Sequence, residues 1–331
     1  MASVSEAAAR AAVSGSFNYL SAAVQPSLYR NGKVFTRRDP DGSDDHWEGV
    51  DLVPHRMTVQ DARPLEAAER RTLAGNGFEM RADPLARPDL DFFDHDQVLR
   101  GYYPLCAEIV RAASGARFVG AFDHNVRSAA GKQSRRRIQG GQQVQGPAHV
   151  VHGDYTLTSA PQRLRDLAHP PGGNDTLRTL LAEGEALLSE EEVERALDGG
   201  RFAIINVWRN IAREPVATHP LALCDAASVA PEDLVVFEIH YQDRIGENYF
   251  AKHSEGHRWY FYPALTRDEA LLIKQWDSAG ALARSEGAHG DGTGGAAPCT
   301  FSFHSAFEDP TTPPDAPERW SIEVRCVALY D

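Results

Sequence analysis

Two stretches in the second half of the chain decide the fold: residues 201–208, RFAIINVW, and residues 234–241, LVVFEIHY. Both are short and rich in β-branched and aromatic residues, which is typical of strands. Similar runs follow at residues 248–253, 258–262, 270–276, 300–307 and 320–330. Turn-forming residues separate them, and short strands at this spacing favour a sandwich or a barrel. The pattern predicts a mainly β protein with flanking helices, in which the strands form a jelly roll.

Before residue 201, the sequence pattern predicts helices more often than strands. Short apolar pieces between polar turns indicate an irregular wrap over residues 1–60. Helices are predicted at residues 65–76, 95–114 and 176–198, with Pro104 kinking or dividing the second of them. We expect one domain over residues 1–331, in which an N-terminal wrap with helices (1–116) precedes a jelly-roll core (117–331). The core begins with a predicted strand at 117–124 and has insertions near 128–147 and 280–297.

The composition describes a globular protein without a nucleic-acid surface. Of the 331 residues, 42% are hydrophobic and 24% are charged, and the formal net charge is -13. Phosphate backbones call for an excess of Lys and Arg, so nucleic acid is not an expected partner. One basic run, Arg135 to Arg137, is interpreted as a solvated loop, and its alternative is a mobile lid that steers an anionic substrate.

Cysteine usage and hydropathy bear on the compartment. The four cysteines form no CxxC pair, which favours a reducing, cytoplasmic setting. The N-terminus lacks the long apolar run of a signal peptide, and no stretch approaches the about 20 apolar residues that span a bilayer. We expect a soluble protein with a small-molecule substrate and no membrane partner, and base rates for oligomers favour a homodimer.

The segment from Ala148 to Thr156, AHVVHGDYT, contains a His-x-Asp pair, His152 and Asp154. In an extended segment the side chains at i and i+2 point to the same face. One imidazole and one carboxylate can therefore reach a common metal ion. His149 is an alternative ligand, but no carboxylate follows it at i+2, so His152 is preferred.

A third ligand candidate lies far downstream. His304 stands in a strand-like apolar run, and an Arg-x-Ser, Arg319 to Ser321, follows fifteen positions later. Two histidines and one carboxylate form the facial triad of non-haem iron(II) oxygenases, which leaves open positions for a bidentate 2-oxo acid and dioxygen. Arg319 suits the far carboxylate of that acid because a guanidinium donates in a fixed fork, and Ser321 adds a hydroxyl.

Each of these residues taken singly is more often structural, since a lone His in a strand is usually a core residue. Together, in this order and on a β-rich half, they favour a metal site. Further residues are candidates for the pocket wall, although a core role is open for each of them: His124, Tyr155, Asn206, Trp208, Arg209 and Tyr260. Arg209 has an alternative role as the ion-pair partner of Asp225.

These motifs occur in an order that resembles the oxidoreductase family of CmcJ/NvfI type, which includes the cephamycin methoxylation component and gibberellin-desaturase-like proteins. The resemblance spans nearly the whole chain. It rests on FNYL at 17–20, GFE at 77–79, FDH at 122–124, HGDYT at 152–156, INVWR at 205–209, HSAF at 304–307 and RWSIEVR at 319–325. The typical Trp-Arg-Pro of the family reads Trp208-Arg209-Asn210 here, which indicates a different turn after that strand.

The resemblance implies a double-stranded β-helix of the cupin-like kind that uses Fe(II), 2-oxoglutarate and dioxygen. It implies His152, Asp154 and His304 as iron ligands. Arg319 becomes the anchor of 2-oxoglutarate, with Arg325 as the second candidate. The implied activity is a dioxygenase of secondary metabolite biosynthesis, which oxidises an unactivated C–H bond by hydroxylation, desaturation or ring formation and releases succinate and CO2.

Three other functions compete with this one. A methyltransferase is disfavoured because no Gly-rich turn follows a strand and opens a helix. A zinc hydrolase could use the same three ligands, and a jelly-roll protein could bind a small ligand without turnover. Iron content and succinate formation distinguish the oxygenase from both.

Overall fold

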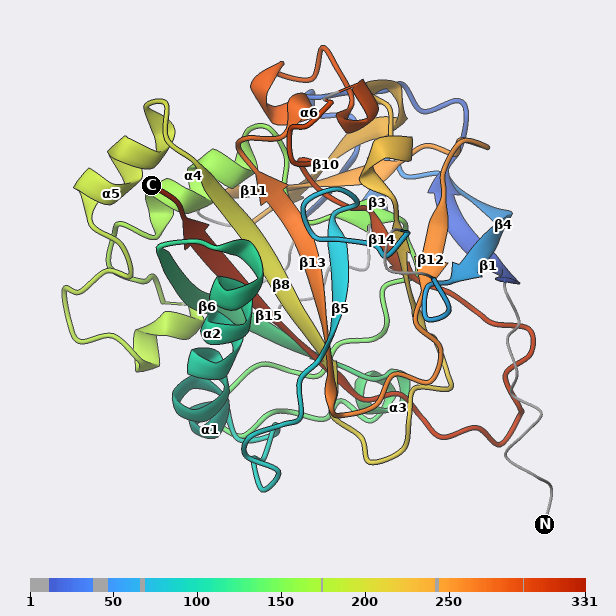
Figure 1. Cartoon of the computed structure of the whole chain (residues 1–331), viewed down its shortest axis with the longest axis horizontal. Coiled ribbons are helices and arrows are strands. Elements are labelled where there is room, and N and C mark those ends of the chain that lie inside the picture. The colour runs from blue at the N-terminus through green and yellow to red at the C-terminus, as the bar shows by residue number, and fades with distance from the viewer. Residues whose placement is uncertain (1–11, 38–46, 66–68, 174, 242–243, 294) are drawn as a thin grey trace.

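The computed structural model describes residues 12–37, 47–65, 69–173, 175–241, 244–293 and 295–331. Within these ranges the strands form one sheet of ten strands and one of five, while the helices are short (Figure 1). The predicted fold class is confirmed, because the protein is mainly β with flanking helices and its two sheets curl as in a jelly roll.

The larger sheet carries strands from both ends of the chain. Its order is β1-β4-β12-β9-β14-β7-β11-β10-β2-β3. The bounds are β1 (Ala12–Leu20), β2 (Phe35–Arg37), β3 (Trp47–Glu48), β4 (Leu52–Asp61), β7 (His152–Gly153), β9 (Leu221–Cys224), β10 (Leu234–His240), β11 (Ile245–Ala251), β12 (Trp259–Phe261) and β14 (His304–Ala306).

The smaller sheet has the order β5-β13-β8-β15-β6 and is antiparallel throughout. Its strands are β5 (Phe78–Ala82), β6 (Phe118–Arg127), β8 (Phe202–Asn210), β13 (Glu269–Asp277) and β15 (Ser321–Leu329). Phe301 helps to join the two sheets, because its ring stacks on Tyr249 of β11 at 5.9 Å and on Trp276 of β13 at 6.5 Å. Every residue of β8 is buried, including the polar Asn206, Arg209 and Asn210.

The helices flank the smaller sheet. α1 (His95–Gln97), a π-helical segment (Val98–Tyr102) and α2 (Tyr103–Ser114) form one continuous helix, which packs on β6 and β15 (Figure 1). This confirms the helix predicted at 95–114. Tyr103 N–H bonds to Val98 O, five residues back, and Pro104 has no N–H to offer, so the irregularity sits beside the proline. The other helical pieces are α3 (Ala129–Gln133), α4 (Ser159–Asp166), η2 (Thr176–Thr179), α5 (Glu190–Leu197), η3 (Ala226–Ser228), η4 (Pro231–Asp233), α6 (Ala281–Arg284) and η5 (Asp291–Thr293).

The irregular wrap predicted over residues 1–60 is wrong for its longest pieces. β1 and β4 pair antiparallel from Ala12↔Gln60 to Leu20↔Leu52. Phe17 and Val59 are buried on the inner face, while polar residues alternate with them along both strands. This period of two was masked by the many polar side chains on the outer face. Residues 1–11 and 38–46 of the predicted wrap lie outside the described residues.

Two predicted helices are corrected. In 65–76 the described residues form turns, because Asn76 Oδ1 accepts from Thr72 N–H and Gly77 takes a positive φ of 89°. In 176–198 the chain makes the short η2, turns at Gly184 (φ 82°) and begins α5 only after Ser189. Ser189 and Glu192 form a reciprocal capping box, which fixes that start.

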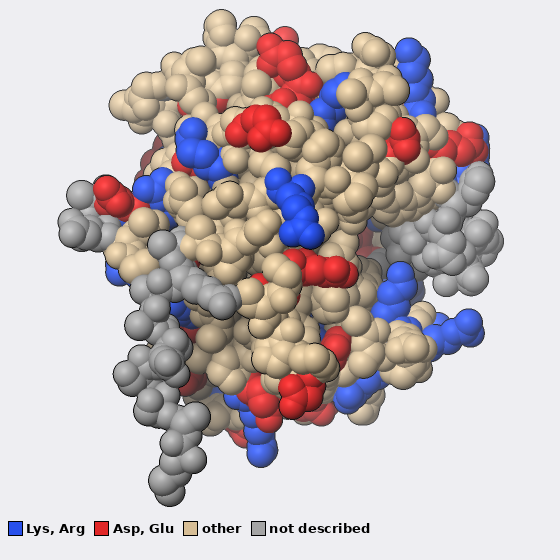
Figure 2. Space-filling view, turned by 90° about the vertical axis from the view of Figure 1, so that its right-hand side faces the viewer, with Lys and Arg blue, Asp and Glu red and all other residues tan. Residues whose placement is uncertain are grey.

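The segments 128–147 and 280–297 are largely turns, with the short α3 in the first and α6 and η5 in the second. Arg136 of the basic run is not simply solvated, since its guanidinium lies 3.7 Å from the centre of the Phe93 ring. On the face in Figure 2, acidic and basic side chains are interspersed rather than gathered into one patch of either sign. Among the described residues, no helix is long and apolar enough to cross a bilayer.

Arg209 of β8 is a buried cation that fastens the helical flank to the smaller sheet. Its side chain donates to the Tyr102 hydroxyl at 2.9 Å and to the carbonyl oxygens of Asp83 and Arg267 at 2.8 and 2.7 Å. It also pairs with the Asp83 carboxylate. The ion pair with Asp225 considered for Arg209 is therefore wrong, and Arg209 acts as a structural residue rather than a pocket wall.

Arg209→Met is expected to lower the free energy of unfolding by about 2–4 kcal/mol, because two carbonyl oxygens and the Tyr102 hydroxyl lose their donor. Urea denaturation measures the change. Arg100→Met, at a guanidinium whose side chain is 62% exposed, is the control and should change stability little. Equal stability of both variants would contradict the structural role.

Candidate metal centre

His152, Asp154 and His304 converge because of strand pairing. His304 of β14 lies directly opposite His152 of β7 in the antiparallel register, and Asp154 follows two residues after His152. One ligand atom from each of the three residues lies within 4.8 Å of the other two. Nε2 of His152 is 3.7 Å and Nε2 of His304 is 3.9 Å from Oδ1 of Asp154. Two nitrogens and one oxygen thus surround a common point.

Neighbouring groups orient two of these side chains. Nδ1 of His152 hydrogen-bonds to the Val150 carbonyl at 2.8 Å, so Nε2 is the nitrogen that faces the other ligands. Oδ2 of Asp154 accepts from Asn206 Nδ2 at 3.0 Å and from Arg325 Nε at 3.4 Å. Oδ1 is the oxygen left to face the imidazoles. Hydrogen bonds to the ligand atoms that do not bind the metal fix the orientation of a metal ligand in this way.

Gly153 stands between the two sequential ligands for a steric reason. A Cβ built on it would lie 2.9 Å from both Cδ2 and Cε2 of the Phe301 ring. The core ring therefore packs directly on the backbone between His152 and Asp154. Any side chain at this position would push the two ligands away from Phe301.

The protonation states suit a metal ion. Burial, and next the charge of His304, lower the pKa of His152 to about 4, and burial also lowers the pKa of His304. Burial alone would raise the pKa of Asp154, but Arg325 and the two imidazoles outweigh it and hold that pKa well below its usual range. Near neutral pH the site therefore presents two neutral imidazoles and a carboxylate, the forms that bind divalent metals.

Arg325, the second candidate anchor, is already paired. Its guanidinium bonds to Asp123 at 2.8 Å and to Asp154 at 3.4 Å, and Asp123 in turn accepts from the Thr176 hydroxyl at 2.7 Å. Arg325 thus holds a ligand carboxylate in place.

Arg319, the first candidate anchor, lines a small, partly open cavity together with His152 and His304. Trp208 also lines this cavity, as the pocket prediction has it. Ser321 is buried at the start of β15, and its hydroxyl has no partner within the described residues.

Other predicted pocket residues lie elsewhere. His124 faces α2, where its Nδ1 contacts the Tyr103 hydroxyl at 2.9 Å. Tyr260 packs in an apolar cluster with Phe78. Tyr155 is buried beside the metal-site carboxylate but is not among the residues that line the cavity. Asn206 reaches the site as a support of Asp154 rather than as a wall.

Two charged cavity residues escaped the sequence reasoning, Arg127 and Glu323. The predicted strand ended at His124, whereas β6 continues to Arg127 and carries that side chain to the inner face. A signal existed in the alternation of polar residues Asp123, Asn125 and Arg127. This alternation did not identify the cavity because a strand face made of polar residues has the same sequence pattern whether it faces solvent or a buried site.

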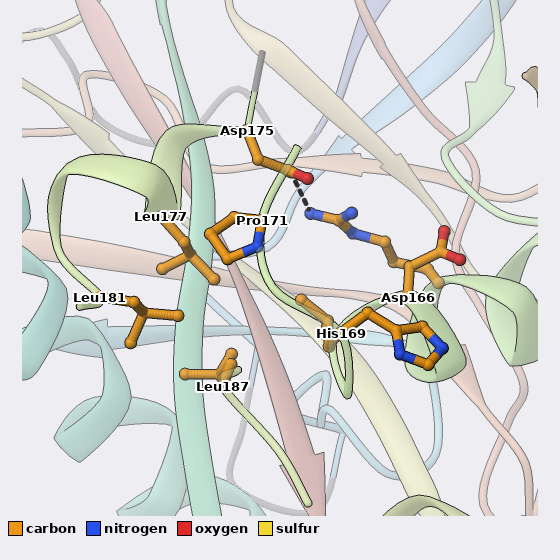
Figure 3. A pocket seen from close by; sticks show the side chains of 9 residues that line it. Asp166, His169, Pro171, Asp175, Leu177, Leu181 and Leu187 are labelled. Carbon is orange, nitrogen blue, oxygen red and sulfur yellow. Dashed lines mark hydrogen bonds and ion pairs between the residues drawn. The ribbon is translucent and has the colours of Figure 1, made fainter. Parts of the chain in front are cut away.

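A second, partly open hollow lies at the end of α4. Figure 3 shows Leu177, Leu181 and Leu187 on one side of it and Asp166 and His169 on the other. Arg163, which also lines it, pairs with Asp175 at 3.0 Å, so both charges are satisfied. Within the described residues, His152, Asp154 and His304 are the one group of three side chains that could hold a metal ion. None of these three residues lines the second hollow.

Comparison with known proteins gives a consistent result. Residues 17–329 match the family described as oxidoreductase/YMDC permease-like domain. An uncharacterized protein from the dcmA 3' region of Methylophilus leisingeri is 45% identical over 195 residues, 59% of this chain and 88% of that protein. The α-ketoglutarate-dependent dioxygenase PhiK of a fungal species is 32% identical, covering 72% of this chain and 73% of its own.

One relative is similar in both sequence and structure. The Fe(II)/2-oxoglutarate-dependent dioxygenase NvfI of Aspergillus novofumigatus is 28% identical over 311 residues, 92% of this chain and 94% of that protein. A solved structure of the iron and α-ketoglutarate-dependent endoperoxidase NvfI superposes with a TM-score of 0.72 at 24% identity, covering 97% of this chain and 99% of that one. At this identity the superposition establishes the fold.

Asn206→Ala is expected to weaken Fe(II) binding about ten-fold, because Asp154 loses the donor that fixes its second oxygen. An anaerobic competition titration measures the affinity. Asn210→Ala is a matched control, since Asn210 is equally buried on the same strand but bonds to the carbonyls of Glu214 and Leu265. Equal affinities for the two variants would contradict the supporting role.

His124 predicts a pH dependence of stability. Burial lowers its pKa to about 4, against about 6.5 in the unfolded chain. The unfolded state therefore takes up a proton first, and stability is lost as the pH falls from 6.5 towards 4, by on the order of 3 kcal/mol. His124→Gln should flatten this loss in urea denaturation at several pH values. Parallel profiles for the variant and the wild type would refute the assignment.

Proposed function

The chain belongs to the oxidoreductase/YMDC permease-like domain family, together with the NvfI-like Fe(II)/2-oxoglutarate-dependent dioxygenases, and on this premise we propose that it is itself such a dioxygenase. The observation that carries the proposal is the convergence of His152, Asp154 and His304 within 4.8 Å beside a cavity that also contains Arg319.

The donor set fits Fe(II). Two imidazole nitrogens and one carboxylate oxygen on one side of a common point form a facial triad, and the remaining positions stay open. When bound, Fe(II) supplies the activation of dioxygen that couples oxidation of 2-oxoglutarate to succinate and CO2 with oxidation of the organic substrate. His152, Asp154 and His304 bind the metal in this assignment, and Arg325 with Asn206 keeps the Asp154 carboxylate in one orientation.

The cavity fits the far end of 2-oxoglutarate. Arg319 is 2% exposed, and Nε of its guanidinium has no hydrogen-bond partner within the described residues. A carboxylate is the natural partner for such a fork. Ser321 stands two residues further along the same strand face with a hydroxyl that is likewise free to donate. Trp208, Leu221 and Ala306 supply the apolar wall that keeps water from the bound acid.

The organic substrate is proposed to be a small secondary metabolite, oxidised at an unactivated C–H bond by hydroxylation, desaturation or ring formation. Support comes from relatives that are described as dioxygenases of this type. Which outcome follows depends on where the substrate lies relative to the metal, so the shape of the cavity beside Trp208 controls it.

The full-length protein, supplied with Fe(II), 2-oxoglutarate and air, is expected to form succinate slowly even without its substrate, as measured by mass spectrometry. His304→Ala should reduce succinate to the background level because one of the three ligands is lost. His289→Ala, at a histidine on the outer segment 280–297, is the matched control and should leave the rate unchanged.

The rival functions predict other results. A zinc hydrolase would be active with Zn(II) and inactive with Fe(II), and a binding protein would form no succinate with either metal. Succinate that forms equally with and without His304 would also contradict the proposal.

A further inference from the structure

Several buried or half-buried cations in this protein are paired with carboxylates. Arg209 pairs with Asp83, Lys274 with Asp277 at 2.9 Å, and Arg325 with Asp123 at 2.8 Å; Arg163 pairs with Asp175 as well. Such pairing is expected, because an isolated charge away from water is costly. Two guanidiniums near the candidate metal ligands depart from this pattern, the half-buried Arg127 and the buried Arg319. Neither has a carboxylate oxygen within 4.0 Å among the described residues.

Both exceptions line the cavity beside His152 and His304. Arg127 is the last residue of β6 and lies opposite Ser321, the first residue of β15. Arg319 precedes Ser321 by two residues, in the segment that leads into β15, so it is one step diagonal to Arg127. Long side chains meet readily at this spacing.

Backbone carbonyls hold the two guanidiniums without neutralising them. Arg127 Nη1 donates to the Gly146 carbonyl at 3.0 Å, and Arg319 donates to the carbonyl of His219. His219 takes a left-handed conformation (φ 45°), which is strained for a residue with a side chain. The carbonyl of a strained residue thus holds a cation that has no carboxylate oxygen within 4.0 Å.

Arg127 lines the same cavity as Arg319 and two of the metal ligands, so its charge acts on all of them. Burial lowers the pKa of Arg127, and it lowers the pKa of Arg319 to about 9 with Arg127 as the second cause. The charge of Arg127 also depresses the pKa of His152 and His304. An acid that extends from the metal ligands into this cavity therefore meets both Arg127 and Arg319.

The charges around the cavity match a dianion. Arg325 cancels Asp123, and Glu323 cancels one of the two unpaired arginines. Fe(II) beside Asp154 retains one positive charge, and the other arginine adds a second. The two carboxylates of 2-oxoglutarate neutralise this excess, whereas a monocarboxylic 2-oxo acid leaves one buried charge unpaired.

Resting on the proposed function, we propose that Arg127 and Arg319 together bind the far carboxylate of the oxo acid, so that the site selects a 2-oxo dicarboxylic acid over monocarboxylic ones. Arg127 is then a second binding residue, provided by a strand other than the one that carries Arg319. The two arginines form a clamp on the far carboxylate, and the bound acid thereby connects β6 to the segment before β15.

Isothermal titration of the full-length Mn(II)-loaded protein tests this, with 2-oxoglutarate and 2-oxobutyrate as the two ligands. The wild type is expected to bind 2-oxoglutarate more tightly. Arg127→Met should weaken 2-oxoglutarate by about ten-fold or more and change 2-oxobutyrate by less than about two-fold, because only the first acid has the far carboxylate. Arg127→Lys should recover part of the loss. Arg163→Met, which removes a buried but paired guanidinium outside the cavity, is the matched control and should change neither constant.

Ligand-free stability provides an independent readout. Because the unpaired charge of Arg127 is costly to bury, Arg127→Met should unfold at the same or a higher urea concentration than the wild type in the absence of acid. Unchanged binding of 2-oxoglutarate by Arg127→Met would overturn the clamp. Equal weakening of both acids would also overturn it, by placing Arg127 at the metal end. A wild type that binds neither acid would instead reject the proposed function.

Discussion

The antiparallel pairing of β7 with β14 is the constraint on which the rest of the site depends. It sets His152 opposite His304, and the extended backbone after His152 brings Asp154 to the same side. Three ligand atoms converge from two short strands that are far apart in sequence. The packing of Phe301 on Gly153 holds that backbone against the core, and the smaller sheet supplies Asn206 and Arg325, which fix the carboxylate. A shift of one residue in this register would turn His304 away from His152 and Asp154.

The interior of the smaller sheet is unusual in its charge. The face towards the metal ligands carries Asn206, Glu323 and Arg325, and the face towards the helices carries Arg209, so the cations of this sheet have different roles. Arg209 is fully paired and fastens the helices, and Arg325 is fully paired and fixes a ligand. Arg127 and Arg319 lack a carboxylate partner and face the cavity. Unpaired charge is tolerated at the place where an anion is to bind, which is how a protein exchanges stability for affinity.

The metal ligands and the fold class could be predicted from the sequence, whereas several strands, one helix boundary and one cavity residue could not. His152 and Asp154 could be found because two residues in an extended chain share a face, and His304 because it interrupts an apolar strand. β1 and β4 were missed because their outer faces are polar, and the break at Gly184 was missed because the residues around it resemble helix formers. Arg127 was missed for a different reason: a polar inner face differs from a solvated one only once the partner strand is known.

The most direct test of the account is an anaerobic titration of the full-length apoprotein with Fe(II) and then 2-oxoglutarate, followed by visible absorption. A chelate of the oxo acid on Fe(II) at His152, Asp154 and His304 predicts a weak charge-transfer band that appears only when both are present. The band should be absent in His304→Ala. If the wild type retains no iron and shows no band, the three residues do not form an oxygenase centre, and the cavity belongs to a protein that binds a small acid without turnover.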